Sequence, residues 1–407
     1  MNRLKNYIMP ALYNIRHNLS FSLFYVLGTA MSFVFIAIAL QVLYSFIGNV
    51  PPIDRGDRIV SFGSFEDKGG RSHGINAFYT ETLIKNIKGC EMYARWHIED
   101  CDIFVDNGMV SQCVNYVNAD YWKVFRFKFI EGRAFSQQEY ENKQPVAVIN
   151  QMMAKALFRG ENAVGRKIEI QKVSYTITGV VENISFFTTL IADGFWLSDQ
   201  FNTFTPSGSS YYHLEVLFPS AFPIAEAKRE VAQAVKAYFD ARRIKVDISA
   251  EKMKTRKEVV MQEVGLDILS YGIPVIVLLL LVVPAINIVT LSISNSNRRS
   301  EEIAIRRAIG ASRPVLFSYI VVENLILVLA GIVVGLLLFS PVVYGIEYLC
   351  FEDSLLGNVS FLTQLNFMVI LCGVLPLSIL FTLLVSMFPA FVTLRKNMAE
   401  VLKGGSK

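Results

Sequence analysis

Four long apolar runs divide the chain, and they cover residues 19–48, 266–294, 314–348 and 365–388. Because an α-helix rises about 1.5 Å per residue, each run is long enough to cross a hydrocarbon core about 30 Å thick. A more polar region, residues 49–265, separates the first run from the second. The pattern therefore predicts a membrane protein with four transmembrane α-helices and a large domain between helices 1 and 2.

The basic residues give these helices an orientation. Lys and Arg without acids mark an N-terminal elbow at 1–18, five arginines lie in the loop 295–313, and the tail 389–407 is basic as well. The loop 349–364 has acids but no Lys or Arg. Since basic loops stay in the cytoplasm, both termini and the loop 295–313 are predicted to be cytoplasmic. Residues 49–265 then lie outside the membrane.

The outer region combines strand and helix patterns. At each of its ends the order is strand, helix, strand, and the six segments are 58–65, 78–87, 91–96, 211–218, 221–242 and 245–250. An inner stretch of about 116–195 is richer in alternating apolar residues, which is typical of β-strands. We therefore expect an extracytoplasmic α+β domain of two lobes, with a β-rich lobe inserted in the other.

Composition removes several function classes. The 407 residues are 53% hydrophobic and carry a net charge of +4, which is too small and too scattered to indicate nucleic-acid binding. No phosphate-binding G-x-x-x-x-G-K-[ST] motif occurs, so nucleotide hydrolysis by this chain is not expected. The four histidines have no metal-ligand spacing, and no G-x-S-x-G motif is present. No catalytic residue and no metal site are predicted.

Three cysteines fall in the outer region. A disulfide between Cys101 and Cys113, across adjacent strands, is one interpretation of this pattern. Reduced and buried cysteines, with Cys90 as the third, are an equally good interpretation.

Two features of the third apolar run concern packing within the membrane. Glu323 lies about two turns into the run, where a carboxylate needs a partner or water, and Asn324 and Asn287 are candidate partners. A structural role for this acid is favoured over a proton or substrate contact. Gly331 and Gly335 form a G-x-x-x-G pattern, which permits close helix contact and is a weak signal of dimerisation.

The loop between the second and third runs predicts a short amphipathic helix. Ser300 is suited to cap its start, and Glu301 and Glu302 follow in the first turn, where the helix dipole favours acids. Arg306 and Arg307 fall in the last turn, and Gly310 is suited to end the helix. Ser312 and Pro314 then favour the start of a new helix into the membrane.

Three interpretations of this loop helix compete. Cytoplasmic loops of membrane proteins are usually basic, and a basic amphipathic helix can lie on anionic lipid. Acids beside arginines instead favour docking on a specific protein surface, because electrostatic complementarity gives specificity.

The sequence E-I-A-I-R-R-A-I-G-A-S at 302–312 resembles the cytoplasmic loop of the FtsX/MacB-type ABC transporter permeases. The outer region resembles the MacB-like periplasmic domain in five stretches that occur in the same order: residues 121–135, 145–150, 157–158, 164–168 and 175–181. With the elbow and the tail included, the resemblance covers nearly the whole chain.

This resemblance implies a permease subunit that couples ATP hydrolysis by a separate cytoplasmic ABC ATPase to a change in its periplasmic domain, with export by mechanotransmission. The loop helix would dock on the ATPase, and the coupling residues are Glu301, Glu302, Ile303, Arg306, Arg307 and Gly310. ATP and Mg would be bound by the partner, and this chain would hold no cofactor.

The resemblance also implies a second permease copy, as a homodimer or with a close paralogue, in the cell inner membrane. A cell with two membranes would add a periplasmic adaptor and an outer-membrane channel. Lipoprotein release, FtsX-like signalling to a cell-wall hydrolase, and a membrane-anchored sensor without ATPase remain alternatives.

Overall fold

The computed structural model describes residues 9, 12–13, 15–105, 108–159, 161–184, 194–201, 212–265, 271–272, 274–279, 281–282, 285–286, 289–290, 305–306, 309–351, 366–381 and 383–385. The chain forms two compact units. The membrane unit comprises Met1–Tyr44, Asp267–Leu349 and Leu365–Lys407, and the outer unit comprises Ser45–Leu266 and Cys350–Gln364. Each unit is described by itself below.

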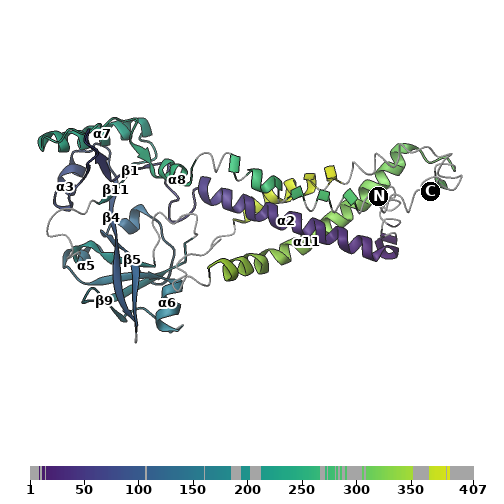
Figure 1. Cartoon of the computed structure of the whole chain (residues 1–407), viewed down its shortest axis with the longest axis horizontal. Coiled ribbons are helices and arrows are strands. Elements are labelled where there is room, and N and C mark those ends of the chain that lie inside the picture. Colours follow the sequence, from purple (N-terminus) through teal and green to yellow (C-terminus); the bar gives the residue numbers. More distant parts are fainter. Residues whose placement is uncertain are drawn as a thin grey trace. The chain divides into compact units, whose positions relative to one another are not determined.

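Three helices of the described residues are long and apolar enough to cross a membrane. They run over Leu19–Phe46, Pro314–Ile346 and Phe367–Val385. The first lies in α2 (Leu19–Ile47) and the second in α11 (Arg313–Phe351), while the third includes α12 (Phe367–Val369) and a π-helical stretch, Ile370–Val374. Both long helices appear in Figure 1.

The predicted second span, 266–294, lies partly outside the described residues. Its described parts at 274–279, 281–282, 285–286 and 289–290 are helical. The elbow has helical residues at 12–13 and 15–17, and the tail 389–407 lies outside the described residues. Three spans are therefore seen.

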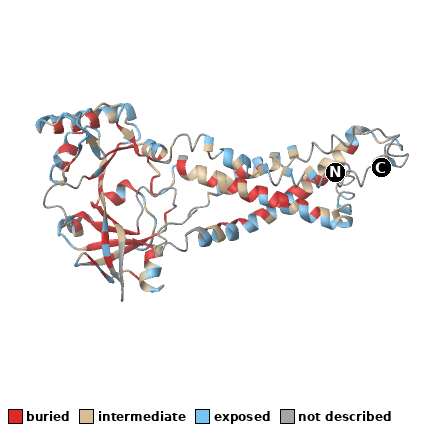
Figure 2. Cartoon of the chain, viewed as in Figure 1, coloured by how far each residue is buried: buried red, intermediate tan, exposed pale blue. Residues whose placement is uncertain are grey.

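Helices α2 and α11 pack closely at the two glycines of the G-x-x-x-G pattern. A Cβ on Gly331 would lie 2.5 Å from Cβ of Thr29, and one on Gly335 would lie 2.9 Å from Cδ1 of Phe33. Figure 2 shows buried residues along both helices. The two glycines therefore allow close contact between two helices of the same chain. From the sequence, the G-x-x-x-G pattern was a weak signal of dimerisation.

The outer unit is built on one large mixed sheet with the strand order β12-β1-β11-β4-β5-β10-β7-β9-β6, and β8 pairs with β4 and β9. The strands are β1 (Ile59–Phe62), β4 (Met92–Val105), β5 (Gly108–Val117), β6 (Phe129–Gly132), β7 (Val146–Asn150), β8 (Lys167–Ile170), β9 (Val173–Val181), β10 (Phe195–Ser198), β11 (His213–Leu217) and β12 (Lys254–Thr255). A hairpin, β2 (Ser64–Glu66) and β3 (Ser72–Gly74), lies apart from this sheet.

The sheet carries two hydrophobic cores. One joins β1 and β11 to α3 (Ala77–Lys85) and α7 (Ile224–Ala241), with Val231, Val235 and Phe239 buried on one side of α7. Figure 1 labels α7, and Figure 2 shows both buried and exposed residues along this helix. The other core joins the middle strands to α6 (Gln151–Phe158) and begins at Cys101, earlier than the predicted inner lobe.

Short helices complete the outer unit, and they are α4 (Tyr121–Val124), α5 (Gln137–Glu141) and α8 (Arg256–Val264). The helix α8 precedes the second apolar run in sequence, so it is the last described helix of the outer unit.

One sequence-based expectation is wrong here. Residues 245–250 do not form a strand, and only one bridge, between Asp67 and Val246, occurs there. Of the two interpretations of the cysteines, the structure has the reduced one, with no disulfide between Cys101 and Cys113. Cys113 faces Asp100 across the ladder, so Cys101 lies one position away and points to the opposite side of the sheet.

Candidate functional sites

The loop helix ends at Gly310. The amide of Ile309 donates to the carbonyl oxygen of Ile305 at 3.0 Å, which is a helical hydrogen bond. The amide of Ala311 donates to the carbonyl oxygen of Arg306, also at 3.0 Å, while Gly310 has a φ of 103°. This is the geometry of a Schellman helix end, in which a residue with positive φ reverses the chain.

The described part of this helix presents an apolar surface. Ile305 is 53% exposed and Ile309 is 81% exposed, and their spacing of four places both on one side of a helix. Beside them the Arg306 guanidinium lies 5.3 Å from the ring centre of Tyr319. Two exposed isoleucines next to a positioned arginine form a surface suited to a protein partner.

Only two residues separate this helix end from α11. The amide of Leu316 donates to the carbonyl oxygen of Ser312, and α11 begins at Arg313 with Pro314 in its first turn. The loop helix is thus joined to a membrane helix by a short, hydrogen-bonded turn. The other predicted coupling residues, Glu301, Glu302, Ile303 and Arg307, lie outside the described residues.

A second candidate site is the base of the outer unit, where the chain enters and leaves it. Residues 45–58 enter and residues 254–264 leave, and we call these two segments the neck. The amide of Lys257 donates to the carbonyl oxygen of Gly56 at 3.1 Å, and β12 pairs with β1. A Cβ on Gly56 would lie 2.8 Å from Cγ2 of Ile53, so only glycine fits without a shift.

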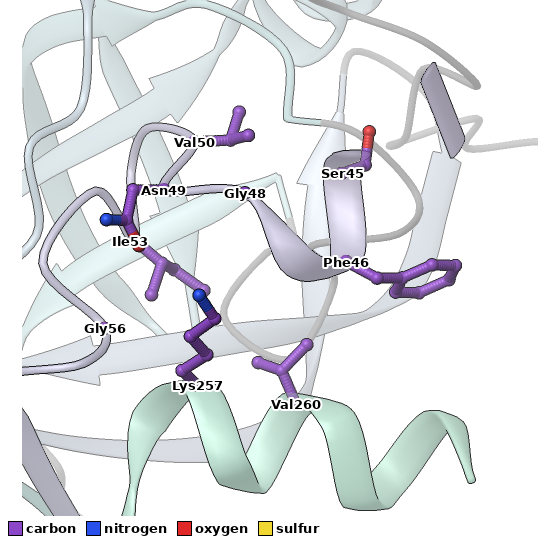
Figure 3. Close-up of a pocket in the computed structure, with 9 residues that line it drawn as sticks. All are labelled: Ser45, Phe46, Gly48, Asn49, Val50, Ile53, Gly56, Lys257 and Val260. Atoms are coloured by element: carbon purple, nitrogen blue, oxygen red, sulfur yellow. The ribbon is translucent and has the colours of Figure 1, made fainter. Parts of the chain in front are cut away.

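Figure 3 shows the neck from the side of α8. Lys257 and Val260 rise from α8 towards Ile53, while Phe46 lies in the last turn of α2. The cavity that they enclose has a volume of about 20 Å³. Sites for small molecules usually measure several hundred Å³, so the neck is a packed joint and not a binding pocket.

A buried ion pair anchors α8 to the sheet above the neck. Nη1 of Arg256 donates to Oε1 of Glu215 at 3.1 Å, and the two side chains are 3% and 1% exposed. Nε1 of Trp96 also donates to this carboxylate at 3.2 Å, and the Ser61 hydroxyl donates to its other oxygen. Burial raises the pKa of Glu215, while Arg256 and the two hydrogen bonds oppose that shift.

This ion pair was not predicted from the sequence. Part of it was visible, because T-R-K-E at 255–258 is a capping-box pattern, and Thr255 and Glu258 do form that box at the start of α8. Nothing local predicts that Arg256 meets Glu215, because the contact depends on where β11 lies in the sheet.

The intramembrane acid is buried. Glu323 and its neighbour Asn324 are each 6% exposed in α11, which fits the structural role expected for this carboxylate. Asn287, the other candidate partner, lies outside the described residues.

Family models match both parts of the chain. The model of the MacB-like periplasmic core domain matches residues 22–234, and the model of the FtsX-like permease C-terminal region matches residues 274–398. The first match alone covers more than half of the chain.

Individual relatives agree with these models. The chain is 25% identical over 350 residues to an uncharacterized ABC transporter permease, YknZ, of Bacillus subtilis, and the match covers 80% of this chain and 79% of the relative. It is 24% identical over 245 residues to the macrolide export ATP-binding/permease protein MacB of Escherichia coli K12, covering 60% of this chain and 37% of the relative. The chain thus spans little more than a third of MacB.

Solved structures with some likeness include the periplasmic region of MacB from Actinobacillus actinomycetemcomitans, at 15% identity and a TM-score of 0.42, covering 52% of this chain and 94% of that one. The extracellular domain of YknZ is similar at 14% identity and a TM-score of 0.38, covering 46% and 99%. By its two domain matches, the chain belongs to the ABC transporter permease family that combines a MacB-like periplasmic core domain with an FtsX-like permease domain.

Proposed function

We propose that this permease couples ATP hydrolysis by a separate cytoplasmic ABC ATPase to movement of its outer unit, and that it exports cargo by mechanotransmission. It would have four membrane helices with both termini in the cytoplasm, and ATP and Mg would be bound by the ATPase. The observation that carries this proposal is the exposed pair Ile305 and Ile309 on a helix that stops at Gly310, two residues before α11.

The path of the movement follows the chain. A push on the loop helix reaches α11 through a turn that is held by hydrogen bonds. The helix α11 packs against α2 at Gly331 and Gly335, where the side chains of Thr29 and Phe33 lie directly against the glycines. The helix α2 leads directly into the neck, which α8 closes on the other side. Packed elements of this kind move as rigid bodies between discrete arrangements.

A second permease copy, a homodimer or a close paralogue, would complete the transporter. Macrolide export is part of the names of the MacB relatives. Because their sequence identity to this chain is low, the cargo of this chain is left open. Lipoprotein release and signalling to a cell-wall hydrolase use the same coupling step, so the first test concerns that step.

The test is a pull-down from detergent-solubilised membranes with a tag on the C-terminal tail, followed by an ATPase assay on the eluate. The native chain should retain an ATPase. Ile309→Asp should lower the retained ATPase activity about tenfold or more, because charge at the centre of an apolar contact costs roughly 2 kcal/mol. Arg306→Glu should act in the same direction, because it reverses the charge beside that contact.

The matched control is Ile130→Asp. Ile130 is 46% exposed on the outer unit, so the same substitution there should leave retention unchanged. If the native chain emerges without ATPase, or if Ile130→Asp lowers retention as much as Ile309→Asp, the coupling proposal is wrong and a sensor without ATPase is the better reading.

A further inference from the structure

A basic cleft lies on the outer unit, away from the neck. It is lined by the β2–β3 hairpin and the segment that follows α7, and its residues are Asp67, Lys68, Gly69, Arg71, His73, Arg243, Ile244 and Lys245. Four permanent cations therefore face a single carboxylate. The cleft has a volume of about 530 Å³, which lies in the range of small-molecule sites.

The one carboxylate in the cleft is already satisfied. Oδ1 of Asp67 accepts from the amides of Gly69 at 2.7 Å and Arg71 at 3.1 Å. Its Oδ2 accepts from Nε of Arg71 and from Nε2 of His73, both at 3.0 Å. These hydrogen bonds, with His73 foremost, lower the pKa of Asp67, so it stays charged and shapes the hairpin.

The cations are left available. Arg71 uses Nε for Asp67, and because its side chain is 80% exposed, its two terminal amino groups remain accessible to a ligand. Lys68, Arg243 and Lys245 are exposed and form no ion pair with a carboxylate among the described residues. Another acid, Asp247, pairs with Lys252, and the charge of Lys68 helps to lower its pKa.

The backbone holds one of these arginines in place. Arg243 directly follows the C-cap residue of α7, and Arg243 itself has a φ of 59°. The amide of Ile244 donates to the carbonyl oxygen of Phe239 at 3.0 Å. This is again a Schellman helix end, where glycine is the usual residue because a Cβ is strained at positive φ. The arginine is thus fixed at the rim of the cleft in a strained conformation.

We propose that this cleft binds a phosphate group carried by a larger solute. The guanidinium groups of two arginines suit the oxygens of a phosphate. Two lysine ammonium groups add further positive charge, so the cleft has more positive charge than one carboxylate can neutralise. The volume leaves room for the group that bears the phosphate. Either a soluble phosphate ester or a lipid headgroup supplies this chemistry.

The test is calorimetric titration of the full chain in phosphatidylcholine nanodiscs, without ATP or ATPase. Its result is therefore independent of the coupling proposal. The probes are glucose 6-phosphate, short-chain dihexanoyl phosphatidic acid and, for comparison, malonate. Glucose 6-phosphate should bind with a dissociation constant below about 1 mM, and binding should weaken as salt is added.

Arg243→Gly is the informative variant, because glycine keeps the helix end and relieves its strain while the guanidinium is lost. We expect it to weaken phosphate binding about tenfold, as expected for one charge-assisted hydrogen bond, and Lys245→Gln should act in the same direction. The matched control is Arg159→Gly. Arg159 is also an exposed arginine with positive φ (51°) at a helix end, and its loss should change nothing.

The two phosphate probes distinguish a lipid headgroup from a soluble phosphate ester. Tighter binding of the short-chain lipid than of glucose 6-phosphate assigns a lipid headgroup, and equal binding assigns a soluble ester. The proposal is overturned if neither phosphate probe binds, if malonate binds as tightly as both, or if Arg159→Gly weakens binding as much as Arg243→Gly.

Discussion

Gly310 is the residue on which the end of the loop helix depends. Its φ of 103° is strained for any residue with a Cβ, although a Cβ there would meet no atom within 4 Å. Gly310→Val should therefore cost about 1–2 kcal/mol through the backbone alone and displace the turn into α11. We expect lower ATPase activity in the purified complex while membrane insertion is retained, measured by ATP turnover and membrane fractionation.

Gly165→Val is the control for that variant. Gly165 also has a positive φ (87°) and open space around its Cα, but it lies in the outer unit. Equal loss of ATP turnover in both variants would show that the effect is general strain and not the loop helix.

The pair of Glu215 and Arg256 makes a second prediction for single residues. Arg256→Met leaves a buried carboxylate without its cation and should destabilise the outer unit by roughly 3–5 kcal/mol at neutral pH. The deficit should shrink as the pH falls towards about 4.5, because the pKa of Glu215 is already raised by burial and protonation removes the uncompensated charge. Thermal unfolding of the full chain, followed by tryptophan fluorescence, measures this.

Two further variants check the cause. Glu215→Gln together with Arg256→Met should recover most of the loss, because the amide oxygen still accepts from Trp96 while the amide nitrogen can donate to the Ser61 hydroxyl. Lys128→Met breaks an exposed pair with Glu182 and should cost less than about 1 kcal/mol. No recovery in the double variant would argue that Arg256 matters for packing instead of charge.

At the scale of elements, the contact of α2 with α11 is the joint to test. Gly331→Val would add a Cβ only 2.5 Å from Cβ of Thr29. Overpacking of this kind costs about 1–3 kcal/mol, so the variant should melt earlier in detergent. Gly345→Val, in the same helix with no atom within 4 Å, should melt like the native chain, and an equal shift would exclude helix contact as the cause.

Elements could be predicted from the sequence where their own apolar residues are enough to define them. The apolar runs at 19–48 and 314–348 coincide with α2 and α11, because length and hydropathy suffice for a membrane helix. The segment 245–250 failed because a strand needs a free sheet edge, and β12 occupies the edge beside β1. The sequence left the state of Cys101 and Cys113 open, because a shift of one residue in register moves a side chain to the other side of the sheet.

At the scale of the whole outer unit, β4 runs from one core to the other, and Arg95 lies on it. Its guanidinium donates to Asp199 at 2.7 Å, to the Tyr140 hydroxyl at 2.9 Å and to the carbonyl oxygen of Ala77 at 3.1 Å. Ala77 begins α3 at the first core, whereas Tyr140 lies in α5 beside the second. These buried contacts join elements on either side of β4.

Tyr140→Phe should loosen that junction. The Tyr140 hydroxyl donates to Asp199 at 2.6 Å, and its loss leaves buried polar atoms without a partner, which costs about 1–3 kcal/mol. Hydrogen exchange should then rise in both α3 and α5. Tyr79→Phe removes a hydroxyl from a half-exposed residue of α3 and serves as the comparison. Faster exchange in α5 alone would mean that α3 and α5 are not joined through Arg95.

The junction itself could not be predicted. Family resemblance and apolar runs indicated a permease with an outer domain, and the loop pattern located the helix that Gly310 ends. The neck, the ion pair of Arg256 and the cleft at Arg243 each join segments that lie far apart in the sequence. Such contacts depend on strand order, which no local pattern encodes.

The hydrogen bond from Lys257 to Gly56 means that the main segment of the outer unit, Ser45–Leu266, has its two ends close together. A domain whose ends touch behaves as an insertion: it can be lengthened, exchanged or removed without pulling its flanking segments apart. Evolution can therefore fit different outer domains to the same membrane segments. An engineer can use the same seam, at residues 56 and 257, to graft a foreign outer domain onto this permease.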